Sequence, residues 1–192
     1  MTFAEIKKIL SDKVVGVAGC GGLGSNAAVA LARVGVGKLI IADFDVIVES
    51  NLNRQYFFYE QIGQKKCFAL KENINKINPN CIVEAHDIKL TASSILELYA
   101  KVDLMIEAFD KAEMKEMLLR TMLHYLPHTP LIMGSGLAGW GNAHLIREHV
   151  FDNVYVFGDG EYEVSENLPP LAPRVGIVAN MQANKALELL LK

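Results

Sequence analysis

The sequence lacks any long hydrophobic run, and it has no excess of positive charge. No uninterrupted apolar stretch approaches the ~20 residues that a membrane-spanning helix needs. The first residues include Glu5, Lys7 and Lys8 instead of the apolar core of a signal peptide. A net charge of −3 provides no basic surface for nucleic acid. These absences predict a soluble, cytoplasmic protein with neither a membrane nor a nucleic acid as its partner.

Cysteine is also scarce. The three cysteines, Cys20, Cys67 and Cys81, lie far apart, and no two of them form a Cys-x-x-Cys pair. This spacing excludes a disulfide framework and a zinc ribbon. We assign none of the three as a nucleophile, because a free cysteine is most often a small buried side chain.

The 192 residues alternate between predicted strands and helices, and their number is typical of one domain. Alternation with these lengths predicts an α/β fold with a Rossmann-like, doubly wound, mostly parallel sheet. There is no internal repeat, so we expect a single domain over residues 1–192. Strands are predicted at 14–18, 38–42, 81–85, 102–107 and 130–134, and helices at 3–10, 25–32, 65–77, 91–100, 113–125 and 174–191.

The last third of the chain departs from this alternation. Residues 142–146 and 153–157 alternate like a hairpin, which predicts antiparallel strands added to the sheet near its C-terminal end. Residues 158–173 are acidic and interrupted by prolines, which predicts an exposed loop before the last helix.

A glycine-rich turn follows the first predicted strand and opens a helix. Glycines allow positive φ and a close approach of the backbone to a ligand, and the free N–H groups at a helix start favour an anion. The turn therefore predicts a nucleotide site. Its residues are Gly19, Gly21, Gly22, Leu23 and Gly24.

A polar cluster follows the second predicted strand, and a nicotinamide site does not require it. Asp43 ends this strand, where an acid accepts hydrogen bonds from a ribose. Asn51, Arg54 and Gln55 follow on the next loop, within reach of a polyphosphate over the glycine turn. Arginine presents a planar fork of donors and stays charged, so it suits the charge that develops in nucleotidyl transfer.

Together these segments resemble the ThiF, MoeB and HesA family, which activates ubiquitin-like sulfur carrier proteins and is related to the ubiquitin-activating enzymes. The resemblance covers nearly the whole chain and is most like the short ThiF variant of thiamine biosynthesis. The matching segments are the glycine turn, Asp43-Phe44-Asp45, Ser50 to Gln55, Ile62 to Lys66, Ala108-Phe109-Asp110 and Leu171 to Gly176.

The resemblance implies an activity and a set of roles. The protein would use ATP and Mg²⁺ to adenylate the C-terminal glycine of a ThiS-like carrier. Asp43 would hold the ribose, whereas Asn51, Arg54 and Lys66 would orient and neutralise the phosphates. Asp110 would bind the magnesium ion. Asp45 belongs to the same motif, either as a ligand contact or as a turn former.

The chain also departs from the family pattern. Larger members have an N-terminal arginine that reaches the partner subunit's ATP, and this chain has no arginine before Arg33. Lys7, Lys8 or a later arginine takes that role, or the variant manages without one. The crossover cysteine and the zinc pairs are missing as well, so we expect a separate sulfur donor protein. The resemblance implies a homodimer, and the apolar residues of the last helix are explained either by a dimer or by core packing.

Other interpretations remain open. The glycine turn alone is more typical of an NAD- or FAD-dependent oxidoreductase, and a scaffold would bind ATP without turnover. Within the adenylation class, the acceptor could be the molybdopterin-synthase carrier, as for MoeB, or a modified tRNA base. Arg54 and Lys66 could be solvated surface charges, and Asp110 could cap the following helix.

Overall fold

The computed structural model describes residues 1–162 and 164–192. Its helices and strands follow the predicted alternation closely. None of the helices among these residues is long and apolar enough to cross a membrane. The helices are α1 Phe3–Leu10, α2 Gly22–Val34, α3 Lys66–Ile77, α4 Ala92–Tyr99, α5 Ala112–Tyr125 and α6 Ala172–Leu190, and the strands are β1 Val14–Ala18, β2 Lys38–Ala42, β3 Ile82–His86, β4 Leu104–Glu107, β5 Leu131–Gly134, β6 Arg147–Phe151 and β7 Val154–Gly158.

The strands form one seven-stranded sheet in the order β3-β2-β1-β4-β5-β7-β6. All neighbours are parallel except β6 and β7, which pair antiparallel at one edge. The α/β class and the mostly parallel sheet are thus confirmed. The strand order reverses between β1 and β4, and in such sheets a ligand binds beyond the carboxyl ends of the strands at the reversal.

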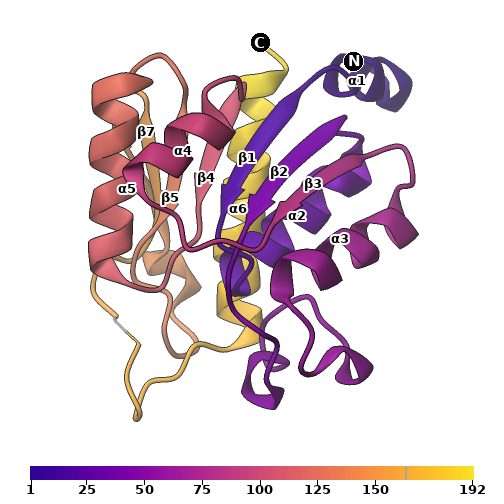
Figure 1. Cartoon of the computed structure of the whole chain (residues 1–192). Coiled ribbons are helices and arrows are strands. Elements are labelled where there is room, and N and C mark those ends of the chain that lie inside the picture. Colours follow the sequence, from indigo (N-terminus) through magenta and orange to yellow (C-terminus); the bar gives the residue numbers. More distant parts are fainter. Residues whose placement is uncertain (163) are drawn as a thin grey trace.

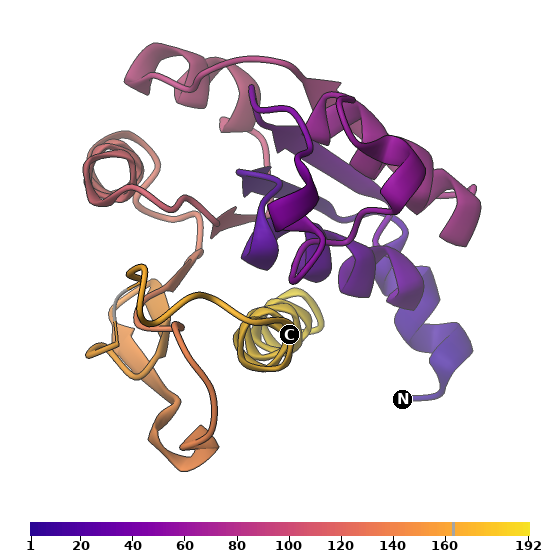
Figure 2. The ribbon, with the colours of Figure 1, turned by 90° about the horizontal axis from the view of Figure 1, so that it is seen from below.

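Helices cover both faces of the sheet. Side chains alternate along each strand, so Leu39 and Ile41 face a core shared with α1, α2, α3 and α6. Ile40 between them faces the second core, under α4 and α5. Figure 2 shows α5 and α6 nearly end-on, on opposite sides of the sheet. The apolar residues of α6 are explained by this packing, because its buried side chains belong to the first core.

The expected hairpin exists, but its first strand was predicted in the wrong place. Residues 143–145 form a 3-10 turn, because Gly141 and Asn142 both have positive φ and turn the chain there. The strand follows as β6, and all five of its residues are exposed. Its polar residues suit an unpaired sheet edge, and they hide the hydrophobic alternation that marks a strand in sequence.

The carboxyl ends of the parallel strands meet at one edge, at the bottom of Figure 1. The loops after β2 and β7 extend below this edge, whereas both termini lie at the opposite end. The glycine turn after β1 and the loop after β4 belong to the same edge, because β1 pairs with both β2 and β4 in parallel register. All the predicted site residues therefore lie on one side of the molecule.

Candidate nucleotide site

The glycine turn is tightly packed against its surroundings. Gly19 has a φ of 98°, and a Cβ atom there would lie 2.8 Å from the carbonyl oxygen of Ala108. A Cβ atom on Gly24 would lie 1.9 Å from the carbonyl oxygen of Gly19. Helix α2 begins at Gly22, and no side chain caps its first N–H groups. These donors are the groups that bind an anion at a helix start.

Asp43 connects the turn to the end of β2. Its carboxylate accepts hydrogen bonds from the N–H of Cys20 at 2.7 Å and from the N–H of Asp45 at 2.8 Å. Burial raises the pKa of Asp43, and the two hydrogen bonds and the charge of Lys66 oppose that rise. The predicted ribose acceptor thus lies directly beside the glycine turn.

Lys66 and Asp45 form an ion pair at the start of α3. The ammonium of Lys66 lies 2.8 Å from Oδ2 of Asp45, and the lysine side chain is only 8% exposed. Because Asp45 is half-exposed, the pair opens toward solvent on its carboxylate side. The two residues predicted to contact ATP therefore contact each other here.

The loop between β2 and α3 brings Asn51, Arg54 and Gln55 to the same edge. Asn51 accepts a hydrogen bond from the N–H of Val48 at 3.2 Å, which closes a 3-10 turn. Gln55 is buried, and its Oε1 atom has no hydrogen-bond partner among the described residues. The stem of Arg54 packs against Gly22, since a Cβ atom there would lie 3.5 Å from Cγ of Arg54.

Asp110 is exposed on the loop after β4. Burial lowers the pKa of Arg54, and the charge of Asp110 acts in the opposite direction, so the two groups are within electrostatic range. Asp110 does not cap the next helix, because α5 begins at Ala112 and its N-cap residue is Lys111. Its carboxylate is therefore available to a ligand.

Two ion pairs near this edge, each with a buried carboxylate, were not predicted. Glu107, the last residue of β4, is fully buried and pairs with Lys115 of α5 at 2.9 Å. Asp159 pairs with Arg174, and both side chains are almost fully buried. The expectation of an exposed loop over 158–173 was thus wrong at Asp159. Acidic neighbours suggested solvent, whereas a partner fifteen residues away explains the burial.

Arg174 holds together three segments beside the site. Its guanidinium donates to the carbonyl oxygen of Gly141 and to Asp159, and it lies 5.9 Å from the ring centroid of Tyr162. It also lines a small cavity of about 250 Å³. The next residue, Val175, packs against Gly22, so the start of α6 lies between this cavity and the glycine turn.

The chemistry of the site suits a phosphate-bound Mg²⁺ ion. The described residues contain no group of three or more side chains that would hold a metal ion by themselves. Mg²⁺ differs from metals that need such a group, because it is commonly bound by one or two carboxylates together with substrate phosphates and water. A single free carboxylate at Asp110, beside the anion-binding turn, fits that mode.

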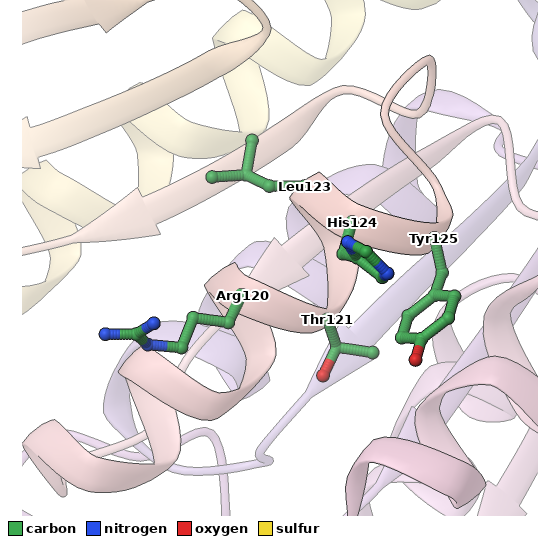
Figure 3. A pocket seen from close by; sticks show the side chains of 5 residues that line it. All are labelled: Arg120, Thr121, Leu123, His124 and Tyr125. Atoms are coloured by element: carbon green, nitrogen blue, oxygen red, sulfur yellow. The ribbon is translucent and has the colours of Figure 1, made fainter.

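A second hollow, of about 540 Å³, lies on the outer surface of α5. Figure 3 shows its lining along one helix. None of the predicted site residues belongs to it, and it is wide open to solvent. We therefore do not connect it with the nucleotide site. Its lining residues are Arg120, Thr121, Leu123, His124 and Tyr125.

Comparison with known proteins shows what the chain is similar to. Molybdopterin-synthase adenylyltransferase of Salmonella typhimurium is 29% identical over 192 residues, which cover 97% of this chain and 76% of the relative. An adenylyltransferase and sulfurtransferase of Eremothecium gossypii is 30% identical over 197 residues, covering 95% of this chain. The match spans only 42% of that larger protein.

Among solved structures, tRNA N6-threonylcarbamoyladenosine dehydratase of E. coli in complex with ATP superimposes with a TM-score of 0.87. The superposition covers 97% of this chain and 89% of the other, at 22% identity, and supports the fold alone. The ThiF family matches residues 2–192, which is nearly every residue described above. The chain belongs to the ThiF family.

Proposed function

We propose that the protein is an ATP-dependent adenylyltransferase acting on the C-terminal glycine of a ubiquitin-like sulfur carrier protein. The carboxylate of the carrier would attack the α-phosphorus of ATP, giving a carrier acyl-adenylate and pyrophosphate. The observation that carries this proposal is that three charged residues gather around the glycine turn: Arg54 packs on Gly22, Lys66 lies within electrostatic range of Cys20, and Asp110 lies within electrostatic range of Arg54. An oxidoreductase needs no such set of charges around its pyrophosphate.

Each residue has a distinct task in this proposal. Asp43 receives the ribose, while the free N–H groups at the start of α2 receive phosphate oxygens. Asn51, Gln55 and the two cations orient the polyphosphate and neutralise the charge that grows as pyrophosphate leaves. A carboxylate is a weak nucleophile, so positioning and charge neutralisation supply most of the rate enhancement.

Asp110 would hold Mg²⁺ against the phosphates. The ion, when bound, would lower the charge on the leaving pyrophosphate. Arg54 lies within electrostatic range of Asp110, so the ion and the arginine would act on the same phosphate groups.

The finer assignment is a ThiS-like carrier in thiamine biosynthesis, with cytoplasmic location and a separate sulfur donor protein. It is supported by the Glu107 to Glu113 and Pro169 to Arg174 segments, which resemble the short ThiF variant. A second candidate is the molybdopterin-synthase carrier, and the relatives named molybdopterin-synthase adenylyltransferase favour it. Both candidates require the same chemistry at the nucleotide.

Exchange of labelled pyrophosphate into ATP tests the proposal. The purified protein is incubated with ATP, Mg²⁺ and either a ThiS-type or a molybdopterin-synthase carrier, each with and without its terminal glycine. We expect exchange that requires the glycine, is larger with the ThiS-type carrier, and disappears in Asp110→Ala. Exchange with only the molybdopterin-synthase carrier would move the protein to the second candidate. ATP binding without exchange with either carrier would contradict adenylation of these substrates.

The proposal includes a homodimer and a single domain over residues 1–192. Because α6 is used in the core, we place the dimer surface elsewhere, on the loops and helix start between residues 44 and 68. Seven large apolar side chains in this segment are exposed, and an apolar patch of this kind commonly marks a protein interface. They are Phe44, Val46, Val48, Phe58, Tyr59, Ile62 and Phe68.

A further inference from the structure

The loop that carries Asp110 is held at its two ends by one ion pair, in which the Glu107 carboxylate is fully buried and the Lys115 side chain is 24% exposed. Both carboxylate oxygens of Glu107, at the end of β4, accept from the ammonium of Lys115, at 3.0 and 2.9 Å. Lys115 also donates to the carbonyl oxygen of Gly134, at the end of β5, at 3.0 Å. An ammonium has three N–H donors, so all three are used. The pair therefore connects β4, α5 and β5.

The backbone next to Asp110 is fixed as well. Oε1 of Glu107 accepts a hydrogen bond from the N–H of Phe109 at 2.6 Å, which closes the turn that leaves β4. On the other side, Gly19 packs so closely on the carbonyl of Ala108 that no Cβ atom would fit between them. The side chain of Asp110, the next residue along the loop, is exposed.

Stability alone does not account for a charged pair at this place. Taking a carboxylate and an ammonium out of water is costly, and a well-packed apolar pair often stabilises a fold as well or better. A pair with fixed geometry does have a use beside a metal ligand, because groups behind a ligand set its direction. The helix start offers no substitute, since no side chain caps the N-terminus of α5.

We infer that the Glu107–Lys115 pair is a positioning device that directs Asp110 toward a phosphate-bound Mg²⁺ ion. The inference rests on the proposed function, because it takes Asp110 as the magnesium ligand. Glu107 and Lys115 act through the loop and touch neither the ion nor the nucleotide. The pair should therefore affect the contribution of Mg²⁺ to ATP binding more than ATP binding itself.

The test compares the dissociation constant of ATP in Mg²⁺ with that in a chelator, together with thermal unfolding. The main variant is the double substitution Glu107→Leu/Lys115→Met, which replaces the pair with apolar side chains. Glu107→Gln keeps the shape of the side chain and serves as a second variant if the double one does not fold. The matched control is Lys185→Met in the C-terminal half of α6, because Lys185 is also largely buried between two carboxylates.

We expect the parent and Lys185→Met to bind ATP more tightly with Mg²⁺ than without it. The double variant should lose about tenfold of this enhancement, as is usual when a group behind a metal ligand is removed. Its ATP affinity in the chelator should not change. A double variant with the parent's full enhancement would overturn the inference, and so would a parent whose ATP affinity does not respond to Mg²⁺.

These measurements use no carrier, so they separate this inference from the proposed function. If pyrophosphate exchange fails with every carrier while the double variant still loses its response to Mg²⁺, the positioning role stands and the carrier assignment falls. If exchange succeeds but the Mg²⁺ response of the double variant equals that of the parent, the adenylation proposal stands and the positioning role falls.

Discussion

Arg54 is the cation best placed to act on the phosphates in the proposed reaction. It is half-buried, packs on Gly22 of the nucleotide turn and lies within electrostatic range of Asp110. If it acts on the transition state, Arg54→Ala should lower carrier-dependent exchange by about 10²-fold or more, by analogy with the loss of one oxyanion-hole donor. Arg120→Ala, which removes an exposed arginine from α5, serves as the control. Exchange near the parental rate in Arg54→Ala would remove this role.

The contact between Lys66 and Asp45 leads to a second prediction. Asp45 either contacts the nucleotide itself or only holds Lys66 in place for it. We expect Lys66→Met to weaken ATP binding by about tenfold, the value of one hydrogen bond to a charged group. Asp45→Asn should have an effect only while Lys66 is present, if Asp45 acts by holding the lysine. A double-mutant cycle of ATP dissociation constants measures this coupling. Additive effects would mean that Asp45 contacts the nucleotide on its own.

Residues in the site differ in how well the sequence predicted them. Asp43 and Arg54 were predicted to lie at one edge because they follow a strand, and parallel strands bring such positions together. Asp110 was predicted from the family resemblance. Lys115 was not, because it lies one helical turn inside α5, where a lysine is ordinarily a solvated surface residue. Its pairing with the buried Glu107 becomes visible only in the folded structure.

At the scale of the helix, alanine substitutions at two glycines should change the stability of the protein in opposite directions. Gly24 in α2 has no room for a side chain, so Gly24→Ala should destabilise the protein by about 2–3 kcal/mol and weaken ATP binding. Gly176 in α6 has open space where a methyl group would lie, with nothing within 4 Å, so Gly176→Ala should stabilise the protein by about 0.5–1 kcal/mol. Urea unfolding of both variants measures the difference. Equal effects would contradict the close packing of the glycine turn.

The Asp159–Arg174 pair joins α6 to two loops and predicts a dependence of stability on pH. Burial raises the pKa of Asp159, but hydrogen bonds from Tyr162, Glu161 and Arg174 outweigh it and leave the pKa below its usual value. A carboxyl with a lowered pKa contributes stability above the unfolded-state value of about 4, and this stability is lost as the pH falls below it.

The test of this dependence is the unfolding midpoint between neutral and strongly acidic pH. Asp159→Asn should lower the midpoint at neutral pH and flatten its fall on acidification. The exposed Asp12→Asn serves as the control and should follow the parent curve. If Asp159→Asn retains the parent's acid sensitivity, another carboxylate is responsible.

Most elements were predictable from sequence because their signals are local. The capping box of Thr2 and Glu5 marks the start of α1, and the glycine at position 35 ends α2 in a left-handed conformation. The strand β6 was misplaced because nothing local distinguishes it. Its five side chains are all exposed, and its position depends on pairing with β7.

At the scale of the molecule, the exposed apolar side chains between residues 44 and 68 predict self-association. We expect sedimentation at a dimer's mass, and a monomer's mass for Tyr59→Glu, because Tyr59 is 73% exposed at the centre of this segment. Tyr125→Glu on α5, at 59% exposure, serves as the control. Sedimentation of the parent as a monomer at high concentration would contradict the dimer, and a dimeric Tyr59→Glu would contradict its location.

The position of α6 has a consequence for how the protein is made. Val175 packs against Gly22, and the N–H of Ala172 donates to the carbonyl oxygen of Asn53 at 3.1 Å. The glycine turn, which is synthesised early, is therefore supported by α6, which is synthesised last. A nascent chain that ends before residue 172 has its glycine turn but not this support. ATP in the cell would therefore begin to stabilise the fold only after α6 has been synthesised and has packed against α2.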